Sequence, residues 1–248
     1  MDETPTPEQE PIASPVDAPK PQPTPGHYPP YDEHRTWRVA HLWTLVTDPS
    51  TYAREHLQYA PSLAVGLMVW ICGAAVVLQR FNMEAAQEIF KHPGNAKTLA
   101  ASVPEWSTLW MIVVLAGMIG GPLRWLVGGW WYGVRLEWCG DRKFNRDYAR
   151  VVFMHSEFLW TLPTLAFALV DTAIYPNFGA AMHAPHNMLL PLVVLCSYGY
   201  SYLLVRSSFE VKRGWTIFWF LAAPASLTFI TLFVAFVAGV VAALRAIH

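Results

Sequence analysis

The stretch from Ser107 to Arg150 decides the fold. It begins as the apolar run STLWMIVVLAGMIGG (107–121), passes Arg124, continues as the glycine- and tryptophan-rich segment WLVGGWWYGV (125–134) and ends as the basic segment RLEWCGDRKFNRDYAR (135–150). Roughly 20 apolar residues suffice for a helix to cross the hydrocarbon core of a bilayer, and tryptophans gather where such a helix meets the headgroups. The stretch therefore predicts a membrane-spanning helix that leads into a loop on the cytoplasmic side.

The composition of the whole chain agrees with a membrane protein. Of its 248 residues, 54% are hydrophobic and 14% are charged, and the mean hydropathy is +0.27, whereas a soluble domain carries roughly 25% charged residues. The net charge of −1 excludes a nucleic-acid binder that depends on clustered lysines and arginines. Cys72, Cys139 and Cys196 do not have the spacing of a disulfide framework or a zinc site. The chain also carries no nucleotide-binding, serine-hydrolase or zinc-protease motif, so we expect no enzyme and no cofactor.

Four further apolar runs surround the central one. The five predicted spans cover residues 62–79, 107–133, 151–174, 188–205 and 215–244. Each run is near the length that a membrane-spanning helix needs. The sequence therefore predicts an all-α fold, a bundle of five transmembrane helices that forms a membrane domain over residues 61–248.

Two segments precede the spans. Residues 1–30 hold half of the twenty prolines, and proline fixes φ and lacks an N–H donor, so we expect residues 1–33 to be a disordered tail. Residues 34–60 are predicted to form interfacial or juxtamembrane helices. The mixture of tryptophan, arginine and histidine in residues 34–46 is typical of a helix on the membrane surface; the alternative is a helix packed on the spans. Asp48 followed by Pro49 predicts a second helix start.

The distribution of basic residues predicts the orientation. With the N-terminus in the cytoplasm, the inside segments hold twelve lysines and arginines and the outside segments hold four. Basic residues favour the cytoplasmic side, so we expect a cytoplasmic N-terminus and a C-terminus on the other side. The bacterial cytoplasmic membrane is the predicted location, with a eukaryotic endomembrane as the alternative.

Four glycines recur at multiples of four residues in the second predicted span: Gly117, Gly121, Gly129 and Gly133. This spacing places them on one stripe of a helix, and small residues allow close approach of a second helix. We expect the stripe to pack against a neighbouring span. The alternative is a face for self-association, which would make the protein a homo-oligomer.

Two charged residues lie inside predicted spans. Arg124 precedes the loop that begins at Arg135 by eleven residues, and Glu157 follows its end at Arg150 by seven. In an antiparallel pair of helices the two residues lie at similar depth, and charges inside a membrane tend to pair. We expect an ion pair. Two alternatives stay open: Arg124 extends to the interface, or both residues join His155 and Asp171 in a polar pathway for protons or a small ion.

The loop after the second span carries four basic residues that could meet lipids or a protein: Arg142, Lys143, Arg146 and Arg150. Basic residues beside a membrane attract anionic headgroups by about 1 kcal/mol each. We expect this loop to face membrane lipids or a partner; the alternative is that it only fixes the orientation. Cys139 beside it is a candidate for reversible palmitoylation.

Two motifs resemble the Yip-one domain family of polytopic membrane proteins, the Ypt/Rab-interacting type, in its bacterial form. They are the lead-in LVTDPSTYAREHLQYAPSL (45–63) and the segment GGWWYGVRLEWCGDRKFNRDYARVV (128–152), and the resemblance extends from Leu42 to the C-terminus. The Asp-Leu-Tyr-Gly-Pro motif of the eukaryotic trafficking members is absent, and Glu157 lies where many members carry a proline.

The resemblance implies a non-enzymatic membrane scaffold or adaptor in membrane organisation or trafficking. The tail and the loop 135–150 would then face a protein partner. The alternative function is a small transporter or channel with a polar path through Arg124 and Glu157.

Overall fold

The computed structural model describes residues 37–91, 105–182, 184 and 189–247, and within these ranges the chain is helical and holds no strand. The short elements are α1 (His41–Thr47), α2 (Pro49–Glu55), the 3₁₀ helix η2 (Leu57–Tyr59), α8 (Phe178–Ala181) and α10 (Arg213–Ile217). The longer helices are α3 (Ser62–Lys91), α5 (Trp106–Leu123), α6 (Gly129–Trp138), α7 (Arg146–Ile174), α9 (Leu190–Ser208) and α11 (Ala223–Ile247). Two π-helical segments, η3 (Arg124–Gly128) and η5 (Phe218–Ala222), join α5 to α6 and α10 to α11.

Four of the described helical stretches are long and apolar enough to cross a membrane: Ser62–Glu84, Trp106–Trp138, Arg146–Ile174 and Arg213–Ala238. The expected fourth span, residues 188–205, corresponds to α9, which is not among them. The serines and tyrosines from Ser197 to Tyr202 lower the mean hydropathy of this 19-residue helix. An all-helical architecture with four helices able to span a membrane is compatible with a multi-pass membrane protein.

The helices extend beyond the expected spans, and this changes the basic loop. α6 continues to Trp138 and α7 begins at Arg146, so the expected loop 135–150 shortens to residues 139–145. Gly140 ends α6 with φ of +101°, a conformation that glycine adopts without cost. The Asn145 side chain caps α7 by accepting hydrogen bonds from the N–H groups of Asp147 and Tyr148. These two local signals make the connection shorter than the distribution of charges suggested.

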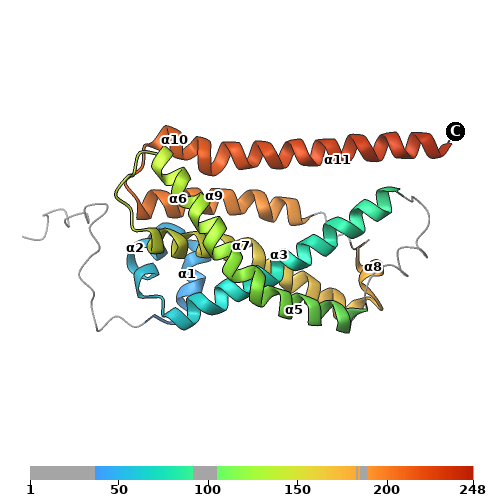
Figure 1. The fold of residues 1–248 in the computed structure, drawn as a ribbon, viewed down its shortest axis with the longest axis horizontal. Helices are drawn as coiled ribbons and strands as arrows, with labels where there is room; N and C mark the ends of the chain where they lie inside the picture. The colour runs from blue at the N-terminus through green and yellow to red at the C-terminus, as the bar shows by residue number, and fades with distance from the viewer. Residues whose placement is uncertain (1–36, 92–104, 183, 185–188, 248) are drawn as a thin grey trace, which may run out of the picture.

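The two ends of the bundle differ in what they carry (Figure 1). α1, α2 and the connections 139–145 and 209–212 gather at one end, whereas α8 and the last turns of α11 lie toward the other. The two connections are joined, because the N–H of Lys212 donates to the carbonyl of Cys139 at 2.9 Å and the N–H of Glu210 donates to Asp141 Oδ2 at 3.3 Å. We call this end the loop end.

The main hydrophobic core lies at the loop end and includes α1 and α2. Leu45 of α1, Tyr52 of α2 and Leu57 are fully buried together with Leu136 of α6 and Leu204 of α9. α2 packs against α9, and its first turn is capped by the Asp48 carboxylate, as the sequence predicts. The expected surface helix is therefore a platform, α1 and α2, whose inner side is part of the bundle core.

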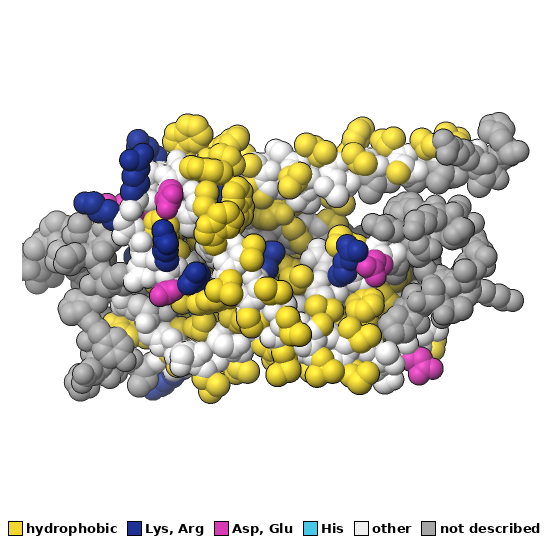
Figure 2. All heavy atoms as spheres, viewed as in Figure 1, with side chains coloured by type: hydrophobic (Ala, Val, Ile, Leu, Met, Phe, Trp, Pro, Cys, Tyr) yellow, Lys and Arg dark blue, Asp and Glu magenta, His cyan; other side chains and the backbone are white. Residues whose placement is uncertain are grey.

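The surface of the bundle is largely apolar (Figure 2). Hydrophobic side chains are spread over α5 and α6 and scattered along α11 in this view, and most of the charged side chains lie at the loop end. α11 runs along one side with most of its large apolar residues exposed, among them Phe229, Phe233 and Phe236. This surface suits contact with lipid tails.

Candidate functional site

Two prolines and two π-helical segments shape the middle of the bundle. Pro122 precedes η3 by two residues, and Pro224 follows η5 by two residues. Proline removes a backbone donor and disturbs the regular hydrogen bonding of a helix, and π-helical turns often occur at functional sites. Arg124 belongs to η3 and Phe220 belongs to η5, and both line the same cavity.

This cavity has a volume of about 180 Å³ and lies between α3, α5–α6, α7, α9 and η5. Its walls are mixed, with hydroxyl, amide and charged groups beside aromatic rings. The lining residues are Gln79, Arg124, Tyr132, Arg135, Phe153, Ser156, Glu157, Trp160, Val194, Ser197, Tyr198, Ser201 and Phe220. We call it the polar cavity. Its charged lining residues are two arginines and one glutamate, so its walls carry one net positive charge.

The structure brings Arg124 and Glu157 together in this cavity. Arg124 Nη2 lies 2.7 Å from Glu157 Oε2, and Arg124 Nε donates to the same oxygen at 3.2 Å. Trp160 Nε1 also donates to this oxygen, at 3.1 Å. The Arg124 side chain is 39% exposed, whereas that of Glu157 is 16% exposed. The carboxylate is thus the more deeply buried partner and the more dependent on the pair.

Arg135 is the second positive charge of the cavity, and its guanidinium contacts two aromatic rings. Its guanidinium carbon is 5.2 Å from the centre of the Tyr132 ring and 4.6 Å from that of Phe220. Its Nη1 donates to the carbonyl of Trp219, in η5, at 3.5 Å. Such cation–π contacts stabilise a charge that has left water. No ion pair joins Arg135 to a carboxylate within the described ranges.

Tyr132 and Arg135 each carry a buried polar atom without a hydrogen-bond partner in the described residues. The hydroxyl of Tyr132 and the Nε of Arg135 are buried and make no hydrogen bond in the part of the chain that the structure describes. The Tyr132 hydroxyl faces the Ser201 side chain, but the two do not reach hydrogen-bond geometry. Buried polar atoms are normally satisfied by protein, water or a ligand. The sequence pattern alone did not single out Arg135 or Ser201; the polar residues within the apolar run of α9 are the signal that points to this wall.

The other residues of the expected polar pathway lie elsewhere. His155 is buried on α7 against Tyr52 of the platform, with ring centres 5.5 Å apart, and it does not line the polar cavity. Asp171 lines a much smaller pocket beside Phe178 and Met182. Of the four residues considered for the pathway, the structure places only Arg124 and Glu157 in one cavity.

The glycine stripe packs inside the chain. A Cβ on Gly117 would lie 2.8 Å from the backbone N of Ala74, and one on Gly121 would collide with the backbone of Val69, both on α3. Gly129 and Gly133 do not face α3, since a Cβ there would meet the side chains of Arg150 and Phe144 respectively. The stripe therefore contacts α3 in its first half. In its second half, after the π-helical segment, Gly129 faces α7 and Gly133 faces the connection 139–145.

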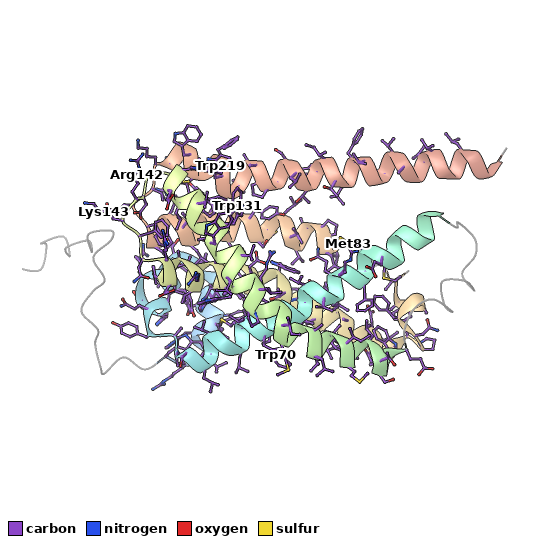
Figure 3. All side chains as sticks on the ribbon, viewed as in Figure 1. Trp70, Met83, Trp131, Arg142, Lys143 and Trp219 are labelled. Carbon is purple, nitrogen blue, oxygen red and sulfur yellow. The ribbon has the colours of Figure 1, made fainter. Side chains whose placement is uncertain are left out.

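The basic residues predicted to form one loop are divided by the structure. Arg142 and Lys143 are exposed in the connection 139–145, and Figure 3 shows both at the tip of the loop end. Arg146 is the first residue of α7, and Arg150, one turn later, pairs with Asp147 at 2.9 Å. Only the first two remain in a loop.

Tryptophans lie close together beside this basic tip. The Trp138 ring lies 5.4 Å from the Trp131 ring and 4.4 Å from the Trp219 ring, between centres. Figure 3 shows Trp131 and Trp219 near each other, where α6 passes close to η5. Aromatic rings of this kind gather at the headgroup level of membranes. The arrangement is compatible with an interface at the loop end.

Cys139 is fully buried at the end of α6. Burial raises the pKa of its thiol, which keeps it protonated and unreactive. The structure therefore gives no support to acylation of Cys139 in the folded protein.

Comparisons with known proteins supply no relative. No protein-family model matches the chain, no curated protein matches it, and no solved structure matches it.

Proposed function

We propose that the chain is a five-span, non-enzymatic membrane scaffold or adaptor of the Yip type, with its N-terminus in the cytoplasm and its C-terminus on the other side. The bacterial cytoplasmic membrane is the proposed location. The two Yip-like motifs (45–63 and 128–152) contribute α2 and the α6–α7 connection, and both elements belong to the loop end.

The course of α9 supports a fifth span. α9 begins after α8 at one end of the bundle and leads into the connection 209–212, which is hydrogen-bonded to Cys139 at the loop end (Figure 1). A helix that connects the two ends of a membrane bundle crosses the bilayer with them. Its polar residues, such as Ser197 and Ser201, line the polar cavity, and polar side chains that face a bundle interior are tolerated.

The position of the basic residues supports the orientation. Arg142, Lys143, Lys212 and Arg213 are exposed at the loop end, which also carries the platform. Basic residues near span ends favour the cytoplasmic side. The loop end is therefore the proposed cytoplasmic face.

The adaptor proposal is based on how the platform is attached to the bundle. α1 is held by Leu45 in the core and by the Tyr200 hydroxyl, which donates to the carbonyl of Val46 at 2.6 Å. Trp43, on the outer side of α1, is 71% exposed, and Val39, in the turn before α1, is 72% exposed. A rigid helix that presents apolar residues beside basic ones is suited to a protein partner or to a membrane surface. In this proposal, the platform and residues 1–33 hold a partner at the membrane.

A pull-down tests the adaptor proposal. The intact protein, a form without residues 1–33 and a Trp43→Ala variant are purified in mild detergent, and co-purifying proteins are identified. Trp130→Ala is the matched control, because Trp130 is 63% exposed on α6, within a helix that can span the membrane. We expect one protein at fixed stoichiometry with the intact chain and the control, and its loss from at least one of the other two forms. Recovery of the chain alone from every preparation contradicts the proposal.

The polar cavity favours a second candidate, a small transporter or channel. Charged groups inside a membrane bundle often mark a pathway for ions or solutes, and Arg124 and Glu157 meet inside this cavity. Measuring the flux of protons or small ions through reconstituted vesicles tests this candidate. A transporter loses flux but keeps its fold when Glu157→Gln is introduced, whereas absence of flux in the unaltered protein excludes this candidate.

A further inference from the structure

We propose that the polar cavity binds one oxyanion, a phosphate or carboxylate group, between Arg135 and the hydroxyls of Tyr132 and Ser201. The proposal goes beyond the adaptor function and does not depend on it. It concerns the part of the cavity wall formed by Arg135, Tyr132 and Ser201, and it assigns a ligand chemistry to that wall.

Arg135 places a positive charge in the cavity without a carboxylate partner among the described residues. Arg135 lines the cavity and has no carboxylate partner in the described ranges. Its contacts are two aromatic faces and one long hydrogen bond to a carbonyl. A guanidinium removed from water without a counter-charge is costly, and aromatic faces compensate for only part of the lost hydration. An anion beside Arg135 supplies the missing counter-charge.

The net charge of the cavity lining favours an anion over a cation. Glu157 accepts two hydrogen bonds from Arg124 and one from Trp160, so the single carboxylate of the cavity is already engaged. Arg135 leaves the lining with one net positive charge. A monovalent oxyanion makes the cavity neutral, whereas a cation would raise its charge further.

The buried hydroxyl of Tyr132 also favours a ligand at this wall, for a reason independent of charge. Tyr132 is completely buried, and its hydroxyl makes no hydrogen bond within the described part of the chain. This hydroxyl and that of Ser201 lie on the cavity wall, and the Arg135 Nε beside them is also unpartnered. An oxyanion accepts from a guanidinium and from hydroxyls at the same time. One bound group therefore satisfies the charge and the buried donors together.

The position of the wall leaves two sources for such a group. Arg135 is one turn from the end of α6 at Trp138, beside the tryptophans of the loop end. The headgroup of an anionic lipid can approach from this end, and so can a small anion from water. The volume of about 180 Å³ exceeds several times the roughly 30 Å³ that one water takes in the liquid, so it admits a phosphate or carboxylate group.

The test measures stabilisation of the full chain by two probes. Thermal unfolding is followed in detergent with sodium phosphate against sodium chloride at equal ionic strength. It is followed separately in phosphatidylcholine nanodiscs with and without phosphatidylglycerol. We expect at least one probe to raise the unfolding temperature in a saturable way. A response to phosphate alone assigns the site to a free anion, and a response to phosphatidylglycerol, with or without a response to phosphate, assigns it to a lipid headgroup.

Variants identify the wall. Arg135→Gln removes the charge, and Tyr132→Phe removes only the hydroxyl while keeping the ring. Arg80→Gln is the matched control, since Arg80 is an exposed arginine of α3 that pairs with Glu84 and is not part of the cavity lining. A charge-assisted hydrogen bond is stronger than one between neutral groups. The apparent affinity is therefore expected to fall about tenfold or more in Arg135→Gln, to fall less in Tyr132→Phe and to stay unchanged in Arg80→Gln.

Three results overturn the proposal: neither probe stabilises the unaltered chain, Arg135→Gln responds as the unaltered chain does, or the control loses the response as strongly as Arg135→Gln. If Arg135→Gln does not fold, Tyr132→Phe decides, because a response unchanged by loss of the buried hydroxyl contradicts the assigned wall.

Discussion

Arg124 and Glu157 meet at a single carboxylate oxygen: Glu157 Oε2 accepts from Arg124 Nη2 at 2.7 Å, from Arg124 Nε at 3.2 Å and from Trp160 Nε1 at 3.1 Å. Three donors converge on one atom of a largely buried side chain. This concentration makes Glu157 the residue whose charge depends most on its partners.

Removing either charge is expected to destabilise the fold unequally. Breaking a buried ion pair costs roughly 3–5 kcal/mol when the remaining charge is left unpaired. Arg124→Gln leaves the more buried Glu157 unpaired and should lower the free energy of unfolding by about 3 kcal/mol. Glu157→Gln leaves Arg124 without its carboxylate, but this longer, 39% exposed side chain can extend toward the headgroups. The cost should therefore be smaller, about 1–2 kcal/mol. Thermal unfolding in detergent measures the order of the two.

The double exchange Arg124→Glu with Glu157→Arg separates pairing from independent effects. It restores opposite charges at the same two positions, so it should unfold at a higher temperature than either single exchange. If the double variant is no more stable than the single ones, the two residues do not stabilise the fold as a pair.

Close packing of α5 on α3 predicts a contrast between glycines. Gly121→Ala places a methyl group against the backbone of Val69, which cannot move aside as a side chain can, and overpacking of this kind costs about 1–3 kcal/mol. Gly199→Ala on α9 meets nothing within 4 Å, and alanine favours a helix over glycine by about 1 kcal/mol. We expect a lower unfolding temperature for the first and an equal or higher one for the second. Equal stability of the two variants would show that α5 and α3 do not approach this closely.

The extent to which the sequence predicted the site can be traced to particular residues. The depths of Arg124 and Glu157 follow from their distances to the basic segment, and the glycine spacing indicated a packing stripe; the structure brings the first two together and places Gly117 and Gly121 against α3. The wall formed by Arg135 and Ser201 was not predicted. Arg135 was assigned to a loop, because the Gly140 and Asn145 signals that shorten the connection were not recognised.

Long-range packing explains the remaining differences. The composition of residues 34–46 fits a helix on a membrane surface equally well as one packed on the bundle. The contact of Tyr52 with His155 of α7 and the packing of α2 against α9 decide between these, and both depend on residues about a hundred or more positions away. The π-helical segments at Arg124–Gly128 and Phe218–Ala222 also have no pattern in the sequence beyond a nearby proline.

The platform is expected to respond to alkaline pH through Tyr52. Burial raises the pKa of this phenol to about 12, although a hydrogen bond from Trp37 Nε1 opposes the shift. The unfolded phenol has a pKa of about 10, so the folded state favours the neutral form. Its contribution to stability is complete below about pH 10 and is lost as the pH rises through about 12. Tyr52→Phe should remove this dependence.

Two measurements follow the effect of Tyr52. The difference in ultraviolet absorbance between the unaltered chain and Tyr52→Phe should titrate near pH 12. Cleavage by a protease within α1 should increase in the unaltered chain between pH 10 and 12, and change less in the variant. A difference spectrum that titrates near pH 10 would show that Tyr52 is accessible to water.

Burial of Cys139 predicts slow reaction with a maleimide. A chain in which Cys139 is the only cysteine should react much more slowly in its folded state than one in which Lys143→Cys is the only cysteine, because the thiol is buried and its pKa is raised. Denaturant should make the two rates similar. Rapid modification of folded Cys139 would mean that the end of α6 opens readily.

Labelling of intact cells with a membrane-impermeant maleimide tests the five-span topology. Two chains are used from which the three native cysteines have been removed, one with Lys143→Cys in the 139–145 connection and one with a cysteine added after His248. Five spans with a cytoplasmic N-terminus predict that the C-terminal cysteine reacts in intact cells, whereas Lys143→Cys reacts only after the membrane is permeabilised. Protection of both cysteines, or reaction of both in intact cells, would place the two positions on the same side and contradict the account.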